Sequence, residues 1–132
     1  MPHGAACAAL LAPVMEANVA ALRSQRPGDP VLGRYAEAAV LMTGDPAASI
    51  EDGLAWIRET VASLQIPGLA AFGLRPAAAR ERASGSSASG SGDIGGGDIG
   101  EITAKAMRSS SMQGNPVALS TGDLRAILAR AA

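Results

Sequence analysis

Apolar residues recur at three- and four-residue spacing in several segments of this chain, which is the pattern of helices that bury one face. The first of these segments runs from about Gly4 to Arg23. Because Pro13 lies inside it and has no backbone N–H, we expect a kink there or a helix that starts later. No segment alternates regularly between apolar and polar residues, so the sequence predicts no sheet.

Start and stop signals bound the second and third helices. Asp29 followed by Pro30 is typical of an N-cap and a first helical residue, and Gly44 of the left-handed residue after a helix. Ser49 followed by Asp52 predicts a capping box at the start of the third helix. The expected inward residues are Val31, Leu32, Tyr35, Ala36, Ala39 and Val40, then Leu54, Ile57, Val61 and Leu64.

The second half of the chain predicts two more helices. One covers about 100–110, with Ile102, Ala106 and Met107 inward. The other is the last helix, capped by Ser120 or Thr121 with Asp123 near its third position. The residues between these two helices are rich in turn formers. Asn115 among them is expected to hydrogen-bond nearby backbone.

An apolar connection over 69–74 and a Ser/Gly-rich run separate the two halves. The composition of about 84–97 offers too little apolar surface to offset the entropy of ordering, which predicts a flexible insert. The expected fold is therefore all-α: one helical bundle over residues 1–132, interrupted by that insert.

Composition limits the partners of the chain. The net charge of 132 residues is −1, and aromatic residues make up only 2%. A chain without basic excess or stacking platforms is not expected to bind nucleic acid. The longest apolar stretch, Gly4 to Met15, falls short of the about 20 residues that span a membrane. No basic region precedes that stretch as in a secretory signal, so we expect no membrane partner and a cytoplasmic location.

Candidate chemistry is sparse. His3 is the only histidine, and one imidazole cannot supply the about four ligands of a free-standing metal site. Cys7 is the only cysteine, which excludes an internal disulfide. It lies on the alanine-rich face of the first helix, where we expect a small buried thiol without a histidine to activate it. The residues alone therefore predict no catalytic group and no cofactor-binding residue.

Several blocks nevertheless resemble one enzyme family, the iron-containing (group III) alcohol dehydrogenases. Residues 1–18 contain Pro-His-Gly, a small-residue helix, Leu-Leu-x-x-Val-Met and Asn18, and they are similar to the family signature. Further similar blocks follow in the family's order, up to Gly114-Asn115-Pro116. These blocks are 34–37, 49–53, 64–67, 102–106 and 110–116. The resemblance covers most of the chain apart from about 80–97, so the expected bundle resembles the C-terminal domain of these enzymes and of dehydroquinate synthase-like proteins.

The resemblance implies a specific chemistry. Such enzymes bind NAD(P) in an N-terminal α/β domain and hold Fe²⁺ or Zn²⁺, through one Asp and three His, in the cleft beside the helical domain. His3 is similar to the last of these histidines and is the implied metal ligand. Ser111 is similar to a position near the substrate pocket of some members. The implied substrate is a small alcohol or aldehyde.

The departures from the family define the expected partner. The nucleotide-binding domain, the Asp and the first two His have no counterpart among the 132 residues. We therefore expect this chain to need a separate N-terminal nucleotide-binding domain, and to show neither turnover nor tight metal binding alone. Assembly as a homo-oligomer stays open. Two alternatives stay open: a non-catalytic helical remnant, and part of a metal-independent relative such as a maleylacetate reductase.

Overall fold

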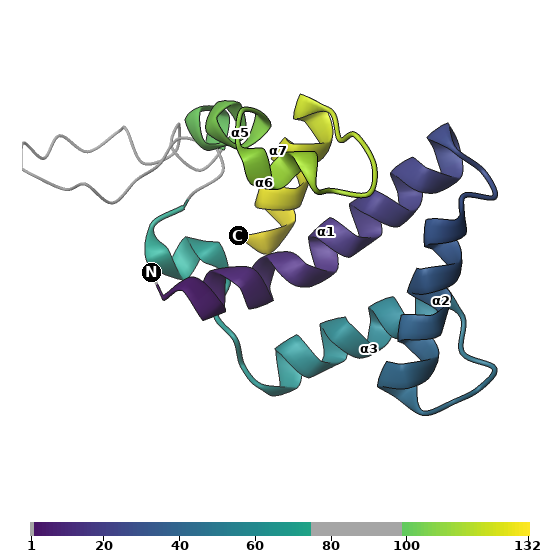
Figure 1. Ribbon diagram of the computed structural model, residues 1–132. Coiled ribbons are helices and arrows are strands. Elements are labelled where there is room, and N and C mark those ends of the chain that lie inside the picture. Colours follow the sequence, from purple (N-terminus) through teal and green to yellow (C-terminus); the bar gives the residue numbers. More distant parts are fainter. Residues whose placement is uncertain (1, 75–98) are drawn as a thin grey trace, which may run out of the picture.

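The computed structural model describes residues 2–74 and 99–132, and all regular elements within these two ranges are helical (Figure 1). The all-α class is thereby confirmed for this part of the chain. The expected insert at 84–97 lies outside the described residues. The elements are α1 (His3–Gln25), α2 (Pro30–Thr43), α3 (Ile50–Ser63), the 3₁₀ helix η1 (Leu69–Phe72), α5 (Ile99–Met107), α6 (Ser110–Gln113) and α7 (Thr121–Ala131).

Helix α1 lies at the centre of the arrangement. Figure 1 shows α2 and α3 on one side of it and α5, α6 and α7 on the other. Helix α1 packs against α7, α3 and α2, while α2 packs against α3 and α5 against α7. The central helix therefore joins two groups of helices, one from residues 30–63 and the other from residues 99–131.

The central helix continues through Pro13, so the expectation of a later start is wrong. A proline inside a helix removes one backbone hydrogen bond and costs about 3 kcal/mol or more. Packing on both sides of α1 offsets this cost, because Pro13 itself is buried together with Ala12, Val19 and Leu22. A continuous helix of 23 residues results.

The length of α1 also corrects the expectation that no segment is long enough to cross a membrane. By length and composition alone, His3–Gln25 meets that requirement. Core helices of soluble proteins and N-terminal signal sequences meet the same requirement, so this property assigns no compartment.

Both ends of α2 follow the predicted signals. The Asp29 carboxylate accepts a hydrogen bond from the Val31 amide at 2.9 Å, which satisfies one of the unpaired N–H groups of the first turn. At the other end Gly44 has a φ of 73°. A residue without a Cβ adopts this left-handed conformation at no steric cost.

Two capping boxes start α3 and α7 with the same geometry. The Asp52 carboxylate accepts from the Ser49 amide at 2.8 Å and from its hydroxyl at 2.6 Å, and the Ser49 hydroxyl accepts from the Asp52 amide at 3.2 Å. Ser120 and Asp123 repeat these three contacts at 2.8, 2.7 and 3.1 Å. Hydrogen bonds from the serine hydroxyl, then from the serine amide, lower the pKa of both carboxyls.

Helices α2 and α3 cross at a very close contact. Ala39 of α2 is fully buried at this crossing. A Cβ built on Gly53 of α3 would lie 2.6 Å from the Ala39 Cβ, closer than side-chain carbons approach one another. The missing side chain at residue 53 therefore sets the distance between the two helices.

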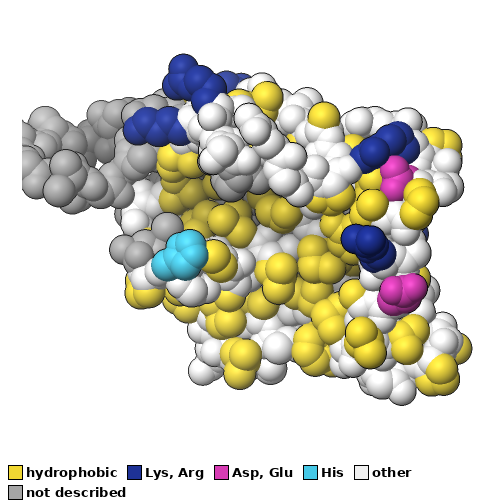
Figure 2. Space-filling model, in the orientation of Figure 1, with side chains coloured by type: hydrophobic (Ala, Val, Ile, Leu, Met, Phe, Trp, Pro, Cys, Tyr) yellow, Lys and Arg dark blue, Asp and Glu magenta, His cyan; other side chains and the backbone are white. Residues whose placement is uncertain are grey.

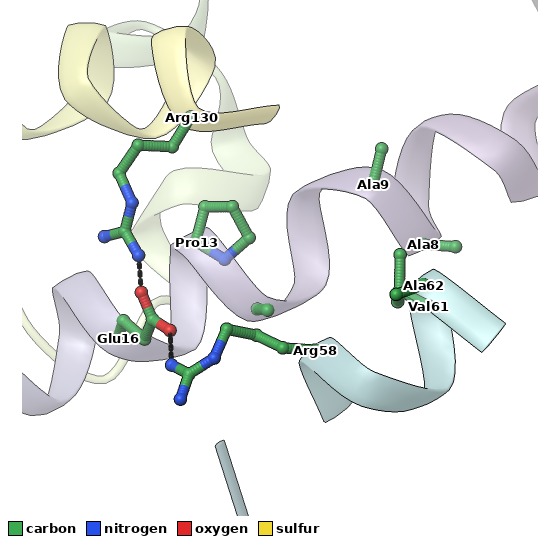
Figure 3. Close-up of a pocket in the computed structure, with 9 residues that line it drawn as sticks. Ala8, Ala9, Pro13, Glu16, Arg58, Val61, Ala62 and Arg130 are labelled. Atoms are coloured by element: carbon green, nitrogen blue, oxygen red, sulfur yellow. Dashed lines mark hydrogen bonds and ion pairs between the residues drawn. The ribbon is translucent and has the colours of Figure 1, made fainter. Parts of the chain in front are cut away.

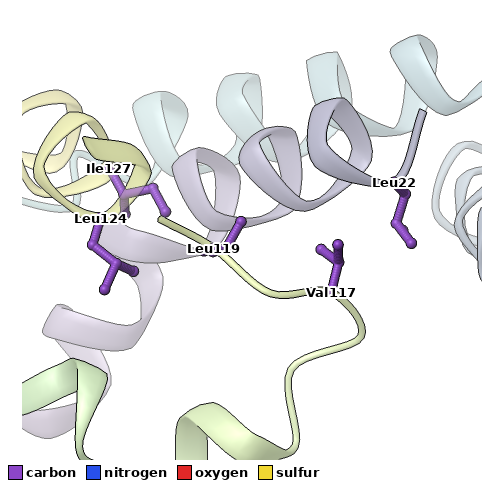
Figure 4. Close-up of a cluster of buried hydrophobic side chains, with 5 residues drawn as sticks. All are labelled: Leu22, Val117, Leu119, Leu124 and Ile127. Carbon is purple, nitrogen blue, oxygen red and sulfur yellow. The ribbon is translucent and has the colours of Figure 1, made fainter. Parts of the chain in front are cut away.

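Among the described residues, two clusters of buried side chains form part of the core. The first joins α1 and α7 through the segment that precedes α7 (Figure 4). Its buried members are Leu22, Val117, Leu119, Leu124 and Ile127. The second cluster gathers η1, α5 and the end of α7, through Leu69, Leu74, Ile99 and Ala131.

Three details of the predicted helices are wrong. Leu64 caps the end of α3 and is exposed, because it lies beyond the last turn that faces the core. Met107, in the last turn of α5, is also exposed. The helix expected over 100–110 ends at Met107, where the amides of Arg108 and Ser109 bond to carbonyls three residues back and turn the chain into α6.

Candidate functional site

His3, the predicted metal ligand, lies in the first turn of α1 and is exposed. Its Nε2 atom is 3.5 Å from the Sγ atom of Cys7, one helical turn further along. The expectation that Cys7 is buried and has no histidine nearby is wrong, since Cys7 is exposed. The four-residue spacing was the available signal, because residues four apart share one face of a helix.

This end of α1 does not by itself form a metal site. Within residues 2–74 and 99–132, no group of three or more His, Cys, Asp or Glu side chains lies close enough to hold an ion. His3 and Cys7 offer two donor atoms, whereas a zinc site usually takes about four ligands or three and a water. The described residues therefore do not fit a complete iron or zinc centre, and further ligands would have to come from elsewhere.

Three polar residues from distant segments form a buried hydrogen-bonded knot, which we call the Asn knot. The Asn18 side-chain amide on α1 donates to Asn115 Oδ1 at 3.0 Å and to the Tyr35 hydroxyl at 3.3 Å. The Asn115 amide donates back to Asn18 Oδ1 at 2.8 Å and to the Val117 carbonyl at 2.7 Å. Asn18 is only 3% exposed, so these bonds satisfy an amide that water does not reach.

The Asn knot brings together residues from three of the sequence blocks that carry the family resemblance. Asn18, Tyr35 and Asn115 come from three different blocks and meet at this point. The expected local bond from Asn115 to backbone is confirmed at Val117, but its partner Asn18 was not foreseen. The knot fastens the segment before α7 to α1, which is a structural role.

Ser111, the predicted substrate-binding residue, belongs to the short helix α6, and its side chain lies outside what the structure describes. A small hollow of about 170 Å³ lies at this end of the molecule. Its walls are mostly apolar: Met107, Met112, Gln113, Val117, Ala118 and Leu119. The role of Ser111 stays a prediction.

A larger pocket of about 230 Å³ lies where α1, α3 and α7 meet, and we call it the arginine–alanine pocket (Figure 3). Its lining residues are Ala8, Ala9, Ala12, Pro13, Glu16, Arg58, Val61, Ala62 and Arg130. Glu16 bridges the two arginines, with one carboxylate oxygen on the guanidinium of Arg58 and the other on that of Arg130. Sequence reasoning missed this cluster, because its members come from three helices with no local motif to connect them.

The surface around the helices is apolar over a wide area. Figure 2 shows hydrophobic side chains gathered in a hollow across one face, with most charged side chains of that face at its margin. Comparison with protein-family models, with curated proteins and with solved structures found no match to this chain. The resemblance to iron-containing alcohol dehydrogenases therefore rests on the quoted residues, and the function that it implies is a proposal.

Proposed function

We propose that this chain is the helical domain of a metal-dependent, NAD(P)-dependent alcohol dehydrogenase that resembles the iron-containing class. In this proposal it works with a nucleotide-binding domain that carries the remaining metal ligands. The observation that supports it most directly is the position of His3. Its imidazole is exposed on the first turn of α1, where a metal held by a second domain can reach it.

The rest of the chain would serve to position that ligand. Helix α1 is held on both sides by α3 and α7, which fixes the direction in which its first turn projects. The all-helical architecture agrees with the domain that the resemblance implies. A bound divalent metal would polarise the substrate oxygen, and this domain would contribute one donor atom to it.

A chimaeric enzyme tests the role of His3. Residues 1–132 would replace the helical domain of an established iron-containing alcohol dehydrogenase, and three versions would be compared: unchanged, His3→Ala and Ser24→Ala. We expect His3→Ala to lose most of the bound metal, measured by mass spectrometry, and with it at least tenfold in the rate of NAD(P) reduction, since outer partners of metal ligands alone are worth about 10–100-fold. Ser24→Ala is the matched control, because Ser24 is exposed at the other end of α1, away from His3, and its loss should keep both metal and rate.

Three results would overturn the proposal. Equal metal content and equal rates in the unchanged and His3→Ala chimaeras would remove the ligand role and favour a metal-independent relative. A chimaera that folds, with an unchanged helical circular dichroism spectrum, but never turns over would favour a non-catalytic remnant. Turnover by the purified chain alone would show that no second domain is needed.

A further inference from the structure

We propose that the arginine–alanine pocket is a binding site for a medium-chain monocarboxylate, whose alkyl chain lies against the alanines and whose carboxylate meets the two arginines. The proposal does not rest on the dehydrogenase function, and its test uses neither cofactor nor metal. It follows from the volume of the pocket, from its apolar lining and from the three charged side chains that line it.

The apolar part of the pocket suits an alkyl chain. Ala8, Ala9 and Ala12 of α1 line it together with Val61 and Ala62 of α3. Figure 3 shows Ala8 beside Val61 and Ala62, where α1 and α3 approach each other. None of these side chains can donate or accept a hydrogen bond, so the wall offers nothing to a polar group. The pocket volume of about 230 Å³ is small compared with the pockets of drug-sized ligands, which favours one short alkyl chain.

The charged end selects a single negative charge. Among the described lining residues only Glu16, Arg58 and Arg130 are charged, so two positive charges face one negative charge. Each guanidinium has five N–H donors, and Glu16 accepts from each of them with one oxygen. One further carboxylate would bring the net charge of this cluster to zero. It would also accept from N–H groups that Glu16 does not use.

Exposure makes those donors accessible. Glu16 is enclosed, with its side chain 13% exposed, whereas the arginine side chains are 54% and 53% exposed for Arg58 and Arg130. The two guanidiniums, which flank the Glu16 carboxylate in Figure 3, are therefore more open to solvent than the carboxylate itself. An alternative role for Glu16 is to clamp α3 and α7 to α1 with no ligand involved. The two roles differ in the octanoate affinity that they predict for a Glu16→Gln protein: a ligand site predicts tighter binding, and a clamp alone does not.

The first experiment compares ligands on the unchanged protein by isothermal titration calorimetry. Octanoate should bind at least tenfold more tightly than octan-1-ol, because only octanoate supplies the negative charge. Affinity should rise about two- to fourfold per methylene from butanoate to hexanoate and level off once the pocket is filled. Equal affinity for octanoate and octan-1-ol would overturn the proposal. So would the absence of octanoate binding at about 10 mM, because the dissociation constant would then be well above about 1 mM.

The second experiment uses charge variants with a matched control. Arg58→Gln and Arg130→Gln should each weaken octanoate binding about fivefold or more, as expected for a charge-assisted hydrogen bond at a partly exposed site. Arg125→Gln, an exposed arginine of the same helix as Arg130, should change nothing. Glu16→Gln should tighten octanoate binding, because it removes the competing negative charge. Unchanged or weakened binding in a folded Glu16→Gln protein would favour the clamp alone.

The third experiment uses two alanine variants, so that the test does not depend on the folding of the charge variants. Ala8→Leu places extra volume in the wall of the pocket and should abolish octanoate binding. Ala126→Leu adds the same volume on the exposed side of α7 and should bind octanoate as the unchanged protein does. If both proteins keep their helical circular dichroism and bind octanoate equally, the pocket is not the binding site.

Discussion

Asn18 and Asn115 form a closed pair of amide hydrogen bonds across 97 residues of sequence. Each side chain donates to the oxygen of the other, at 3.0 and 2.8 Å, so each amide serves as donor and acceptor to its partner. Neither serine nor alanine can reproduce this pairing. The pair holds the segment before α7 in place, and the core residue Val117 lies in that segment.

Replacing one amide of this pair should destabilise the whole domain. Asn115→Ala leaves the enclosed Asn18 amide with the Tyr35 hydroxyl only, and an unsatisfied buried polar group costs about 1–3 kcal/mol. We expect the free energy of unfolding, measured by urea denaturation, to fall by that amount. Gln113→Ala, at an exposed position nearby, is the control and should stay within about 0.5 kcal/mol of the unchanged protein. Equal effects of the two variants would show that the Asn knot contributes no stability.

Two glycine-to-alanine changes should shift stability in opposite directions. In Gly53→Ala the new Cβ would lie 2.6 Å from the Ala39 Cβ, so the crossing of α2 and α3 must open. Such overpacking costs about 1–3 kcal/mol, more than the about 1 kcal/mol that alanine gains in a helix. In Gly33→Ala nothing lies within 4 Å of the new atom, so stability should rise by about 0.5–1 kcal/mol. Urea midpoints of both variants decide this, and a gain at both positions would contradict the close crossing.

The capping box of α7 should make stability depend on pH at the acid end. Hydrogen bonds from Ser120 lower the pKa of the Asp123 carboxyl in the folded state, so the unfolded chain takes up its proton first as the pH falls. This contribution is complete above the unfolded pKa of about 3.9 and is lost as the pH falls through the lower folded pKa. Between about pH 5 and pH 2.5, the Asp123→Asn protein should therefore lose less stability than the unchanged protein.

The measurement is the thermal midpoint at half-unit steps of pH. Ser120→Ala is the companion variant, because it removes the hydroxyl that donates to Asp123. It should lower stability near neutral pH by about 0.5–2 kcal/mol. It should also reduce the fall of the thermal midpoint at acid pH. If the thermal midpoint falls equally with decreasing pH in all three proteins, the capping box does not couple folding to protonation of Asp123.

The thiol of Cys7 should react in the native protein. Because Cys7 is exposed on α1, a colourless aromatic disulfide reagent should titrate one thiol per chain without denaturant. The rate in buffer and the rate in 6 M urea should agree within about tenfold, since no local unfolding is needed for access. A thiol that reacts only in urea would place Cys7 inside the core.

Local signals predicted the ends of helices well. Asp29, Gly44, Ser49 and Ser120 act through neighbours two to four residues away, and all four occur in the structure as the sequence indicated. The later helix start that Pro13 suggested is wrong, because the local cost of a proline ignores the packing of α1 against α3 and α7. Propensity is a local property, and burial is decided by distant segments.

The candidate sites were less accessible from sequence. The Glu16 ion pairs join α1 to α3 and α7, and a charge on one helix contains no information about which arginine it will meet. The contact of His3 with Cys7 could be predicted from their spacing of four residues, but we expected a buried thiol and therefore did not predict it. The metal role of His3 and the substrate role of Ser111 come from the resemblance alone and stay predictions.

The central position of α1 has a consequence for the order in which the domain folds. The α2–α3 pair is joined by the short connection 44–49 and can form early, since closing a short loop loses little entropy. Docking of α7 on α1 instead requires segments about a hundred residues apart to meet, as the Asn18–Asn115 separation of 97 shows. Amides of α3 should therefore gain protection in pulse-labelling hydrogen exchange before those of α7, and during that interval the apolar side of α1 that α7 later covers would be open to self-association.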